Sequence, residues 1–212
     1  MRWLPGLAKE AYRSRYGLDA VGSYLIDLRF GGRCGGVIPS PYAERGAYYT
    51  VSVYYHWLDY LFSRNNLVVS PGDVLVDVGC GKGRVINWWL RRGYQNQIVG
   101  IELNERVAEA TRVRLRGWPN VEIITGDAVD KLPGSATLMF MFCPFKAPVM
   151  ERFSQRLREL AKSNRGIRVV YYNCKYLDVF QSDKVWDVRA LKTGNALLPA
   201  ALIQPRRPEL CG

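Results

Sequence analysis

The residues with the clearest chemical meaning form a glycine-rich turn at the end of a short apolar run. Residues 74–78 are typical of a buried strand, and Gly79, Gly81 and Gly83 follow it in a Gly-x-Gly-x-Gly pattern that opens a helix. Glycine is needed where the backbone takes a positive φ and passes within contact distance of a ligand. In α/β folds such a turn lies at the carboxyl end of a strand, where these sheets bind ligands. The pattern therefore predicts a ligand-binding loop.

Two positions discriminate between the ligands that this loop could hold. The dinucleotide fingerprint Gly-x-Gly-x-x-Gly needs glycine at position 84, where this chain has Arg84. Asp77 lies two residues before Gly79, and a carboxylate there repels a pyrophosphate but suits a cationic amino-acid group. The sequence thus favours S-adenosylmethionine over NAD as the cofactor.

Two more carboxylates end the next two predicted strands. Glu102 follows the loop by about 20 positions, the spacing at which a carboxylate in this architecture binds a ribose diol. Asp127 ends the third strand, where it can accept from an adenine amino group. Each acid alone could be a solvated loop residue or a helix cap, but together they predict one site. The cofactor-binding residues expected in it are Asp77, Gly79, Cys80, Gly81, Gly83, Glu102, Leu103, Asp127 and Ala128.

These segments resemble motifs one to three of the class I S-adenosylmethionine-dependent methyltransferases. The resemblance rests on residues 77–84, Glu102 and residues 126–128, and it covers about residues 67–204. It implies an α/β, Rossmann-like three-layer sandwich with a seven-stranded, mostly parallel sheet and an antiparallel terminal strand. The Gly-Cys-Gly-Lys-Gly-Arg form, with Tyr-Gly-Leu-Asp before it, is similar to a group of small prokaryotic methyltransferases. More remotely it is similar to protein-lysine methyltransferases of the non-SET type.

The fourth predicted strand leads into Cys143, Pro144 and Phe145, which we expect to form the reaction centre. Amino-group methyltransferases carry an Asn/Asp/Ser-Pro-Pro-Tyr/Phe motif at this position, so the residues match in part. In that motif a polar side chain and a carbonyl align the target amine, and the aromatic ring packs on it. Cys143 is a poor acceptor, so backbone carbonyls would do the aligning. Cys143 could act as a nucleophile and His56 as a base, but for each of them a packed structural role is favoured.

Aromatic residues before the first strand of the repeat are candidates to cover the cofactor. Residues 39–42 and 48–50 lie at the distance from the loop at which related enzymes fold a segment over the ligand. Either tyrosine cluster could form this cover, and Tyr49 and Thr50 are our candidates for cofactor contact. Tyr54, Trp57 and Tyr60 recur at helical spacing and are equally well explained as a packed helix face.

The elements that position these residues follow an alternating strand and helix pattern from about residue 67. The predicted strands are 74–78, 98–101, 121–125, 136–142 and 167–171, with a terminal hairpin of 184–192 and 196–204. Helices are predicted after Gly83, over 104–116 with Asn104 as N-cap, and over 147–162. The N-terminal part is predicted to hold helices at 8–16 and 48–63 and a flexible loop at 31–36. We divide the chain into a helical and loop lid (1–66), a Rossmann-like domain (67–205) and a tail (206–212).

The amino-acid composition indicates which kinds of partner the protein can have. The chain has 30 Lys and Arg against 19 Asp and Glu, a formal net charge of +11. Such a field attracts nucleic acid, an anionic membrane or an acidic small molecule, although the basic residues are spread along the whole chain. With no long apolar run and no signal-peptide pattern, we expect a cytoplasmic protein without a membrane partner. Five widely spaced cysteines and one histidine indicate no disulfide framework and no metal.

These expectations converge on an S-adenosylmethionine-dependent methyltransferase that acts on nitrogen. The methyl acceptor is not determined by the sequence; a protein lysine is preferred, and a nucleic-acid base nitrogen is the alternative. A small-molecule acceptor also remains open. The rival from a different class is a non-catalytic S-adenosylmethionine-binding module, because the polar residue expected at position 143 is missing.

Overall fold

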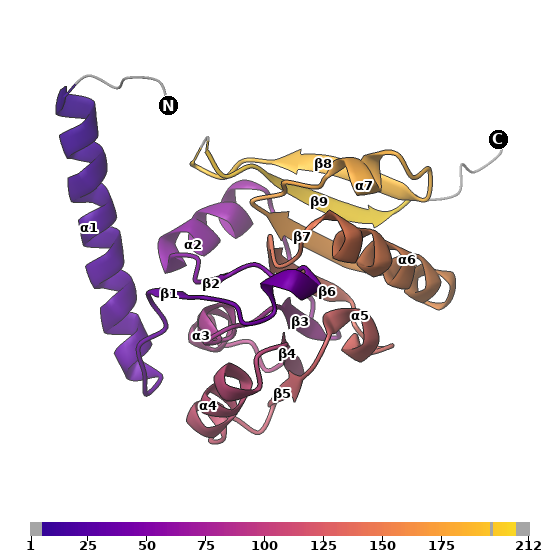
Figure 1. The fold of residues 1–212 in the computed structure, drawn as a ribbon, viewed down its shortest axis with the longest axis horizontal. Coiled ribbons are helices and arrows are strands. Elements are labelled where there is room, and N and C mark those ends of the chain that lie inside the picture. Colours follow the sequence, from indigo (N-terminus) through magenta and orange to yellow (C-terminus); the bar gives the residue numbers. More distant parts are fainter. Residues whose placement is uncertain (1–5, 196, 207–212) are drawn as a thin grey trace.

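A single seven-stranded sheet organises the chain. The computed structural model describes residues 6–195 and 197–206, and its sheet has the strand order β5-β4-β3-β6-β7-β9-β8 (Figure 1). Strands β3 to β7 are parallel, and β9 runs antiparallel to both β7 and β8. This confirms the predicted α/β fold with its antiparallel terminal strand. The strands are β3 (Leu75–Val78), β4 (Ile98–Glu102), β5 (Val121–Thr125), β6 (Leu138–Phe142), β7 (Arg168–Tyr172), β8 (Trp186–Leu191) and β9 (Ala200–Pro205).

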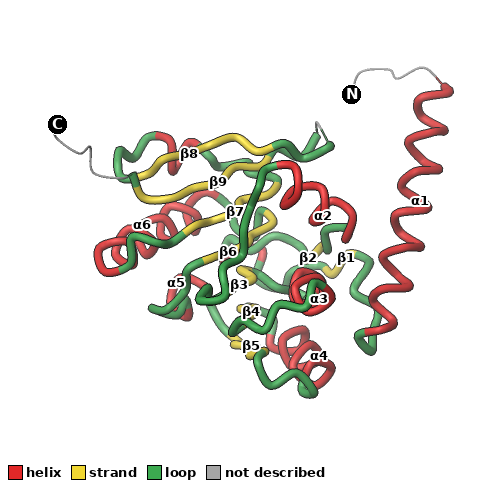
Figure 2. The backbone as a smooth tube through the Cα atoms, turned by 180° about the vertical axis from the view of Figure 1, so that it is seen from behind, coloured by secondary structure: helices red, strands yellow, loops and turns green. Residues whose placement is uncertain are grey.

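Helices cover both faces of the sheet, as Figure 2 shows from behind. The first group is α2 (Tyr55–Arg64), α3 (Arg84–Arg91) and α4 (Glu105–Leu115). The second group is α5 (Ala128–Lys131), α6 (Ala147–Ser163) and α7 (Asp178–Gln181). Buried side chains of each group pack with strand residues into a separate apolar cluster, so the sheet is the middle layer of a three-layer sandwich. The predicted N-cap Asn104 is confirmed, since its side chain accepts from the amides of Arg106 and Val107.

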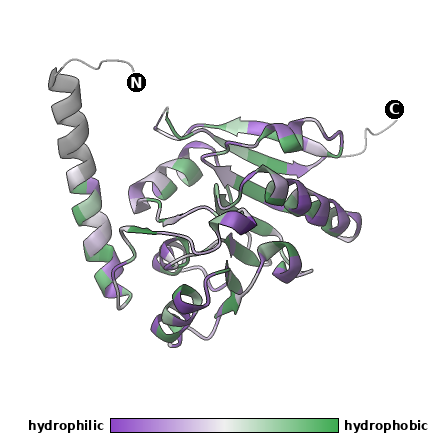
Figure 3. Ribbon diagram, viewed as in Figure 1, coloured by the Kyte–Doolittle hydropathy of each residue, from purple (hydrophilic) through white to green (hydrophobic). Residues whose placement is uncertain are grey.

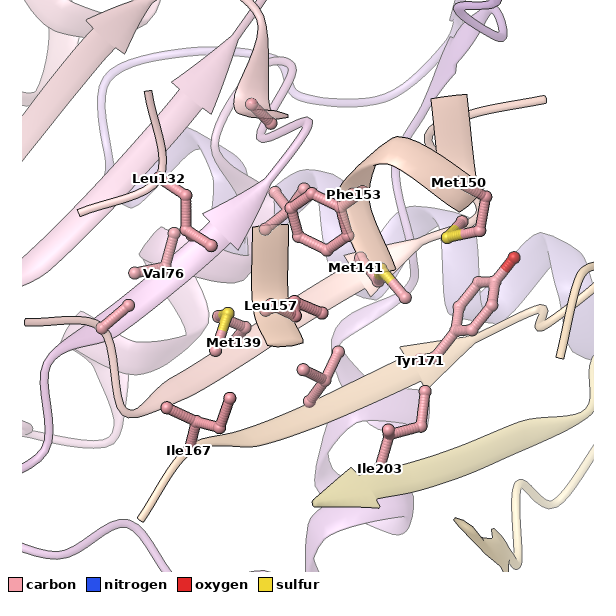
Figure 4. Packing of buried hydrophobic residues seen from close by; sticks show 14 of the residues in the cluster. Val76, Leu132, Met139, Met141, Met150, Phe153, Leu157, Ile167, Tyr171 and Ile203 are labelled. Carbon is pink, nitrogen blue, oxygen red and sulfur yellow. The ribbon is translucent and has the colours of Figure 1, made fainter. Parts of the chain in front are cut away.

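The α6 side of the core shows why the central strands are continuous apolar runs. Met139 and Met141 of β6 pack with Phe153 and Leu157 of α6, and all four are buried (Figure 4). A parallel strand covered on both faces has no solvent side, so its sequence need not alternate. Figure 3 accordingly colours much of the sheet as hydrophobic, whereas α6 carries many hydrophilic positions along its length.

The N-terminal part differs most from expectation. The helix predicted at 8–16 is α1 (Gly6–Arg29), which continues through Gly17 and Gly22 and stands beside the body in Figure 1. Its last turns are held because Ser23 and Asp27, one helical turn apart, are buried against the domain. In the loop at 31–36, predicted to be flexible, Cys34 is buried, whereas Gly31, Arg33 and Gly36 are exposed.

The helix predicted at 48–63 begins seven residues late, at Tyr55. The residues before it are extended: β2 (Thr50–Val51) pairs antiparallel with β1 (Val37–Ile38). A short 3-10 helix, η1 (Ala43–Arg45), lies between these strands. The β-branched residues at 50, 51 and 53 favour extended backbone, and this outweighs the aromatic periodicity that suggested a longer helix. We call residues 37–53 the cover segment.

The ends of the other predicted helices and strands agree with the structure within a few residues. The predicted division into a lid region and a Rossmann-like domain between residues 66 and 67 stays a prediction. Beyond Arg206 the predicted tail lies outside the described residues, as does Ala196 of the predicted hairpin. Among the helices of the described part, none is long and apolar enough to cross a membrane.

The packing of α6 can be tested by truncating one ring. Phe153→Ala is expected to lower the free energy of unfolding by about 3–5 kcal/mol, because the ring is fully buried and leaves a cavity. Val113→Ala, on the exposed side of α4, is the control and is expected to change it by less than about 0.5 kcal/mol. Urea unfolding of both variants measures this, and equal losses would contradict the packing described.

Candidate active site

The glycine-rich loop joins β3 to α3, and hydrogen bonds to the end of β4 fix its first residues. The amides of Gly79 and Cys80 both donate to the carbonyl of Ile101 at 2.9 Å, and the amide of Gly81 donates to Glu102 Oε2 at 2.9 Å. All three loop glycines have positive φ. A Cβ on Gly79 would lie 2.9 Å from Pro144, and one on Gly81 would collide with Thr50. The loop is therefore glycine-rich for two reasons, its left-handed backbone and the close approach of neighbouring segments.

One pocket at the carboxyl edge of the sheet brings most of the predicted site together. It is lined by the ends of β4, β5 and β6, by the first loop glycine and by the cover segment, and we call it the main pocket. The predicted residues that line it are Tyr49, Thr50, Gly79, Glu102, Leu103, Asp127, Ala128, Cys143, Pro144 and Phe145. Gly81 and Gly83 do not line it and act through the loop backbone.

Asp77 and Cys80 line a second, smaller pocket that shares Thr50, Gly79 and Phe142 with the main one. The Asp77 side chain is only 4% exposed, and none of the hydrogen bonds among the described residues reaches its carboxylate. Burial, and then repulsion from Glu102, raise the pKa of Asp77 well above its usual value. A buried carboxylate without a donor fits a cationic group of a bound ligand, such as the amino group of S-adenosylmethionine.

Glu102 and Asp127 lie at adjacent strand ends, as their spacing predicts. Glu102 Oε1 accepts from the Asn104 amide at 2.8 Å, so its two oxygens are bound by backbone on both sides. Burial raises the pKa of Glu102, and these amides oppose the rise. Asp127 caps α5 by accepting from the Val129 amide at 2.9 Å. Each carboxylate oxygen has a second lone pair, so these bonds leave both residues able to accept from a ribose or adenine group.

The turn after β6 is strained and tightly held. Cys143 has a φ of 43°, which is uncommon for a residue other than glycine and points to a functional constraint on this turn. The Pro144 carbonyl already accepts from the Tyr48 amide at 3.2 Å. The Phe145 ring packs on Phe153, with centroids 5.3 Å apart. Burial raises the pKa of the Cys143 thiol, which disfavours the thiolate and supports a packed role over a nucleophilic one.

The cover segment contributes one wall of the main pocket. In Figure 1 it crosses the carboxyl ends of the central strands, and both tyrosine clusters weighed from the sequence line the pocket, through Tyr42, Tyr48 and Tyr49. None of the α1 residues from Gly17 to Arg29, whose side chains the structure describes, lines it. Arg45 and Val149 also line the pocket and were not predicted, because their contribution depends on how η1 and α6 meet.

His56, two arginines of α4 and the cysteines have structural roles. His56 Nε2 lies 3.2 Å from Asp19 and its ring stacks on Tyr54, and His56 is not among the residues that line the main pocket. Arg112 and Arg114 donate to backbone carbonyls, at Ile123 for the first and at Phe30 and Lys82 for the second. Four cysteines, Cys34, Cys80, Cys143 and Cys174, are free, and the described residues contain no cluster of metal-ligating side chains.

Comparison with known proteins finds methyltransferases. Residues 75–166 match the family described as a methyltransferase domain. The mRNA cap guanine-N(7) methyltransferase of Saccharomyces cerevisiae is 29% identical over 85 residues, which are 38% of this chain and 19% of that protein. The ribosomal RNA small subunit methyltransferase A of Dehalococcoides mccartyi is 28% identical over 65 residues, which are 31% of this chain and 22% of that protein. The chain thus spans about a fifth of the length of these relatives.

Solved structures share the fold. An RNA methyltransferase from Salinibacter ruber, solved with S-adenosyl-L-homocysteine, superposes with a TM-score of 0.51 at 21% identity, covering 75% of this chain and 97% of the other. A variant of MtNAS solved with S-adenosylmethionine gives a TM-score of 0.53 at 16% identity, covering 71% and 62%. Residues 75–166 thus match a methyltransferase domain, and the sheet has the fold of proteins solved with S-adenosylmethionine or S-adenosyl-L-homocysteine. The narrower prokaryotic and non-SET subgroups are not confirmed.

The role of Asp77 can be tested by removing its charge. A carboxyl whose pKa is raised on folding contributes stability below its unfolded pKa and loses it as the pH rises. Asp77→Asn is therefore expected to raise the melting temperature of the free protein at pH 8 and to flatten its decline between pH 4 and 8. The same variant is expected to weaken S-adenosylmethionine binding at least tenfold, because the buried counter-charge is gone.

Thermal unfolding across that pH range and calorimetric titration measure the two effects. Glu122→Gln, an exposed carboxylate on β5, is the control and should change neither. A variant that binds the cofactor normally would contradict the role given to Asp77.

Proposed function

We propose that this chain is an S-adenosylmethionine-dependent methyltransferase that acts on a base nitrogen of RNA. The match to a methyltransferase domain supports the reaction, which is methyl transfer. The choice of RNA as acceptor is supported by the names of the two relatives and of the Salinibacter ruber structure. A protein lysine, which the sequence made the preferred acceptor, has no support among these relatives. A nucleic-acid base nitrogen, the sequence-based alternative, takes its place, and the RNA named for these relatives narrows it to RNA.

The observation that carries the proposal is the aromatic lining of the main pocket. Tyr42, Tyr48, Tyr49, Phe142 and Phe145 all line it, from the cover segment and from the end of β6. The Tyr49 side chain is 54% exposed and so presents its ring at the pocket mouth. Unpaired RNA bases are planar and stack on such rings, each contact contributing about 1–3 kcal/mol. A flexible lysine side chain requires less aromatic surface.

The residues of this chain bind the cofactor and align the acceptor with it, and none of them needs to transfer a proton. When bound, S-adenosylmethionine supplies an activated methyl group on its sulfonium, so the reaction depends mainly on alignment and exclusion of water. Asp77, Glu102 and Asp127 hold the amino, ribose and adenine groups in this scheme. The turn from Cys143 to Phe145 faces the acceptor, and its rigid backbone fixes the direction of approach.

Three cations around the main pocket support an acidic polymer as partner. Arg45 lines the pocket and lies over the Tyr42 ring. Lys146 follows Phe145 and donates to the Ala43 carbonyl, and Lys175 Nζ lies 5.1 Å from the centre of the Tyr48 ring. All three are exposed, and none joins the ion pairs found among the described residues. We call Arg45, Lys146 and Lys175 the basic rim.

The proposal is tested by transfer of labelled methyl groups to cellular RNA. The purified chain is incubated with methyl-labelled S-adenosylmethionine and either total RNA or total protein, and the modified nucleoside is identified by mass spectrometry. Label in a methylated base supports the proposal, and label in lysine alone overturns the acceptor. Cofactor binding with no transfer to RNA, protein or small metabolites would instead favour the non-catalytic binding module that Cys143 suggests.

The basic rim predicts a salt-dependent affinity for RNA. Replacing Arg45, Lys146 and Lys175 by Gln is expected to weaken binding of a single-stranded RNA. Each replacement should reduce the slope of log affinity against log salt by about 0.7, since one phosphate contact is lost. Arg116→Gln and Arg165→Gln are the controls, because both are exposed and lie near the opposite, amino edge of the sheet. Fluorescence anisotropy between 50 and 200 mM salt measures the slope, and equal changes in rim and control variants would contradict the rim.

A further inference from the structure

A buried ion pair connects α1 to the cofactor loop. Asp27, in the last turn of α1, is 1% exposed, and Arg84, the first residue of α3, is 5% exposed. Arg84 Nη2 donates to Asp27 Oδ2 at 2.6 Å, and Arg84 Nε donates to Oδ1 at 3.2 Å. The contact is side-on and two-pronged, so it fixes the orientation of the guanidinium as well as its position.

The same carboxylate collects two more donors. The Tyr55 hydroxyl donates to Asp27 Oδ1 at 2.8 Å, and the Cys34 amide donates to Oδ2 at 3.0 Å. The Arg84 guanidinium also donates to the carbonyl of Val53, at the end of the cover segment, at 3.4 Å. One ion pair therefore joins α1, the 31–36 loop, the cover segment and the first turn of α3.

A second set of bonds holds the outer half of the glycine loop to the same N-terminal region. The Lys82 carbonyl accepts from the Cys34 thiol at 3.2 Å and from Arg114 Nη2 at 2.6 Å. Lys82 Nζ in turn donates to the Gly35 carbonyl at 2.8 Å. The inner half of the loop is bonded to β4, so the loop is fixed between the sheet on one side and residues 27–35 on the other.

Stability alone does not explain a buried ion pair. Removing two charges from water costs several kcal/mol per ion, and well-packed apolar residues of similar size often do as well or better. What the pair adds is a defined geometry at Arg84, which directly follows Gly83. Arg84 lines the small pocket beside Asp77, so its position shapes the cavity that we assign to the cofactor amino group.

We propose that Asp27 and Arg84 are positioning residues that hold the glycine loop and the cover segment in the arrangement that binds S-adenosylmethionine. In this view the C-terminal part of α1 belongs to the cofactor site, although none of its described side chains lines the main pocket. The proposal depends on the cofactor and not on the identity of the methyl acceptor.

A matched pair of arginine substitutions tests this role. Arg84→Lys keeps the charge but loses the two-pronged contact. Arg168→Lys makes the same substitution at a second Arg–Asp pair at the amino edge of the sheet, where Arg168 Nη2 donates to Asp73 Oδ2 at 2.6 Å and Nη1 donates to the Val68 carbonyl. We expect S-adenosylmethionine to bind at least tenfold more weakly to Arg84→Lys, and with unchanged affinity to Arg168→Lys. Calorimetry on the full chain, without any acceptor, measures both.

Two further readouts separate positioning from general destabilisation. Amide hydrogen exchange of residues 80–84 is expected to accelerate in Arg84→Lys and not in Arg168→Lys, while the melting temperatures of both stay above the assay temperature. In turnover assays, once an acceptor is in hand, Arg84→Lys is expected to raise KM for S-adenosylmethionine more than it lowers kcat. Normal affinity in Arg84→Lys, or an equal loss in both variants, would overturn the proposal.

The double variant Asp27→Leu/Arg84→Met removes both charges together. We expect it to melt below the parent temperature, because the Tyr55 hydroxyl and the Cys34 amide lose their acceptor, but to remain folded at the assay temperature. We also expect it to bind S-adenosylmethionine at least tenfold more weakly, because the directed contact is lost. Parent affinity in a folded double variant would refute the positioning role. If this variant does not fold, the matched lysine substitutions decide the question. If the parent chain and the variants bind S-adenosylmethionine as expected here but the parent chain does not methylate RNA, only the proposed acceptor is refuted.

Discussion

The Glu102 carboxylate accepts hydrogen bonds from two loops at once, and the geometry of the cofactor site depends on it. One oxygen binds the amide of Gly81 in the glycine loop, and the other binds the amide of Asn104 at the start of α4. The strands that carry these loops, β3 and β4, are neighbours and parallel, so their carboxyl ends meet at the same edge. The residue assigned to the ribose therefore also sets the spacing of the two loops around it.

This arrangement has an energetic cost that a cation can offset. Asp77 and Glu102 are both buried, and the pKa of each is raised first by burial. In Glu102 two backbone amides compensate part of the cost, whereas Asp77 has no such donor among the described residues. Functional sites commonly keep such locally unfavourable groups, because the ligand and not the fold supplies the missing partner.

The N-terminal region takes part in the site in two ways. The cover segment contributes side chains to the main pocket, and its Tyr48 amide and Gly46 carbonyl bond to the backbone of Pro144 and Lys146. The end of α1 instead contributes the Asp27 carboxylate to the rear of the glycine loop. The two contributions meet at Arg84, so the region before the sheet supports both the turn after β6 and the glycine loop.

The sequence by itself determined the fold class, the glycine loop and the three strand-end carboxylates. These features are local or periodic: a buried strand, a Gly-x-Gly-x-Gly turn and acids at strand ends keep their spacing whatever surrounds them. Only the tertiary structure decided that residues 48–54 are extended, that α1 continues to Arg29, and that Asp27 pairs with Arg84. The partners of that pair are 57 positions apart, and no local pattern records which distant charge a buried residue will meet. Packing against the sheet, which brings α1, the cover segment and α3 together, made those choices.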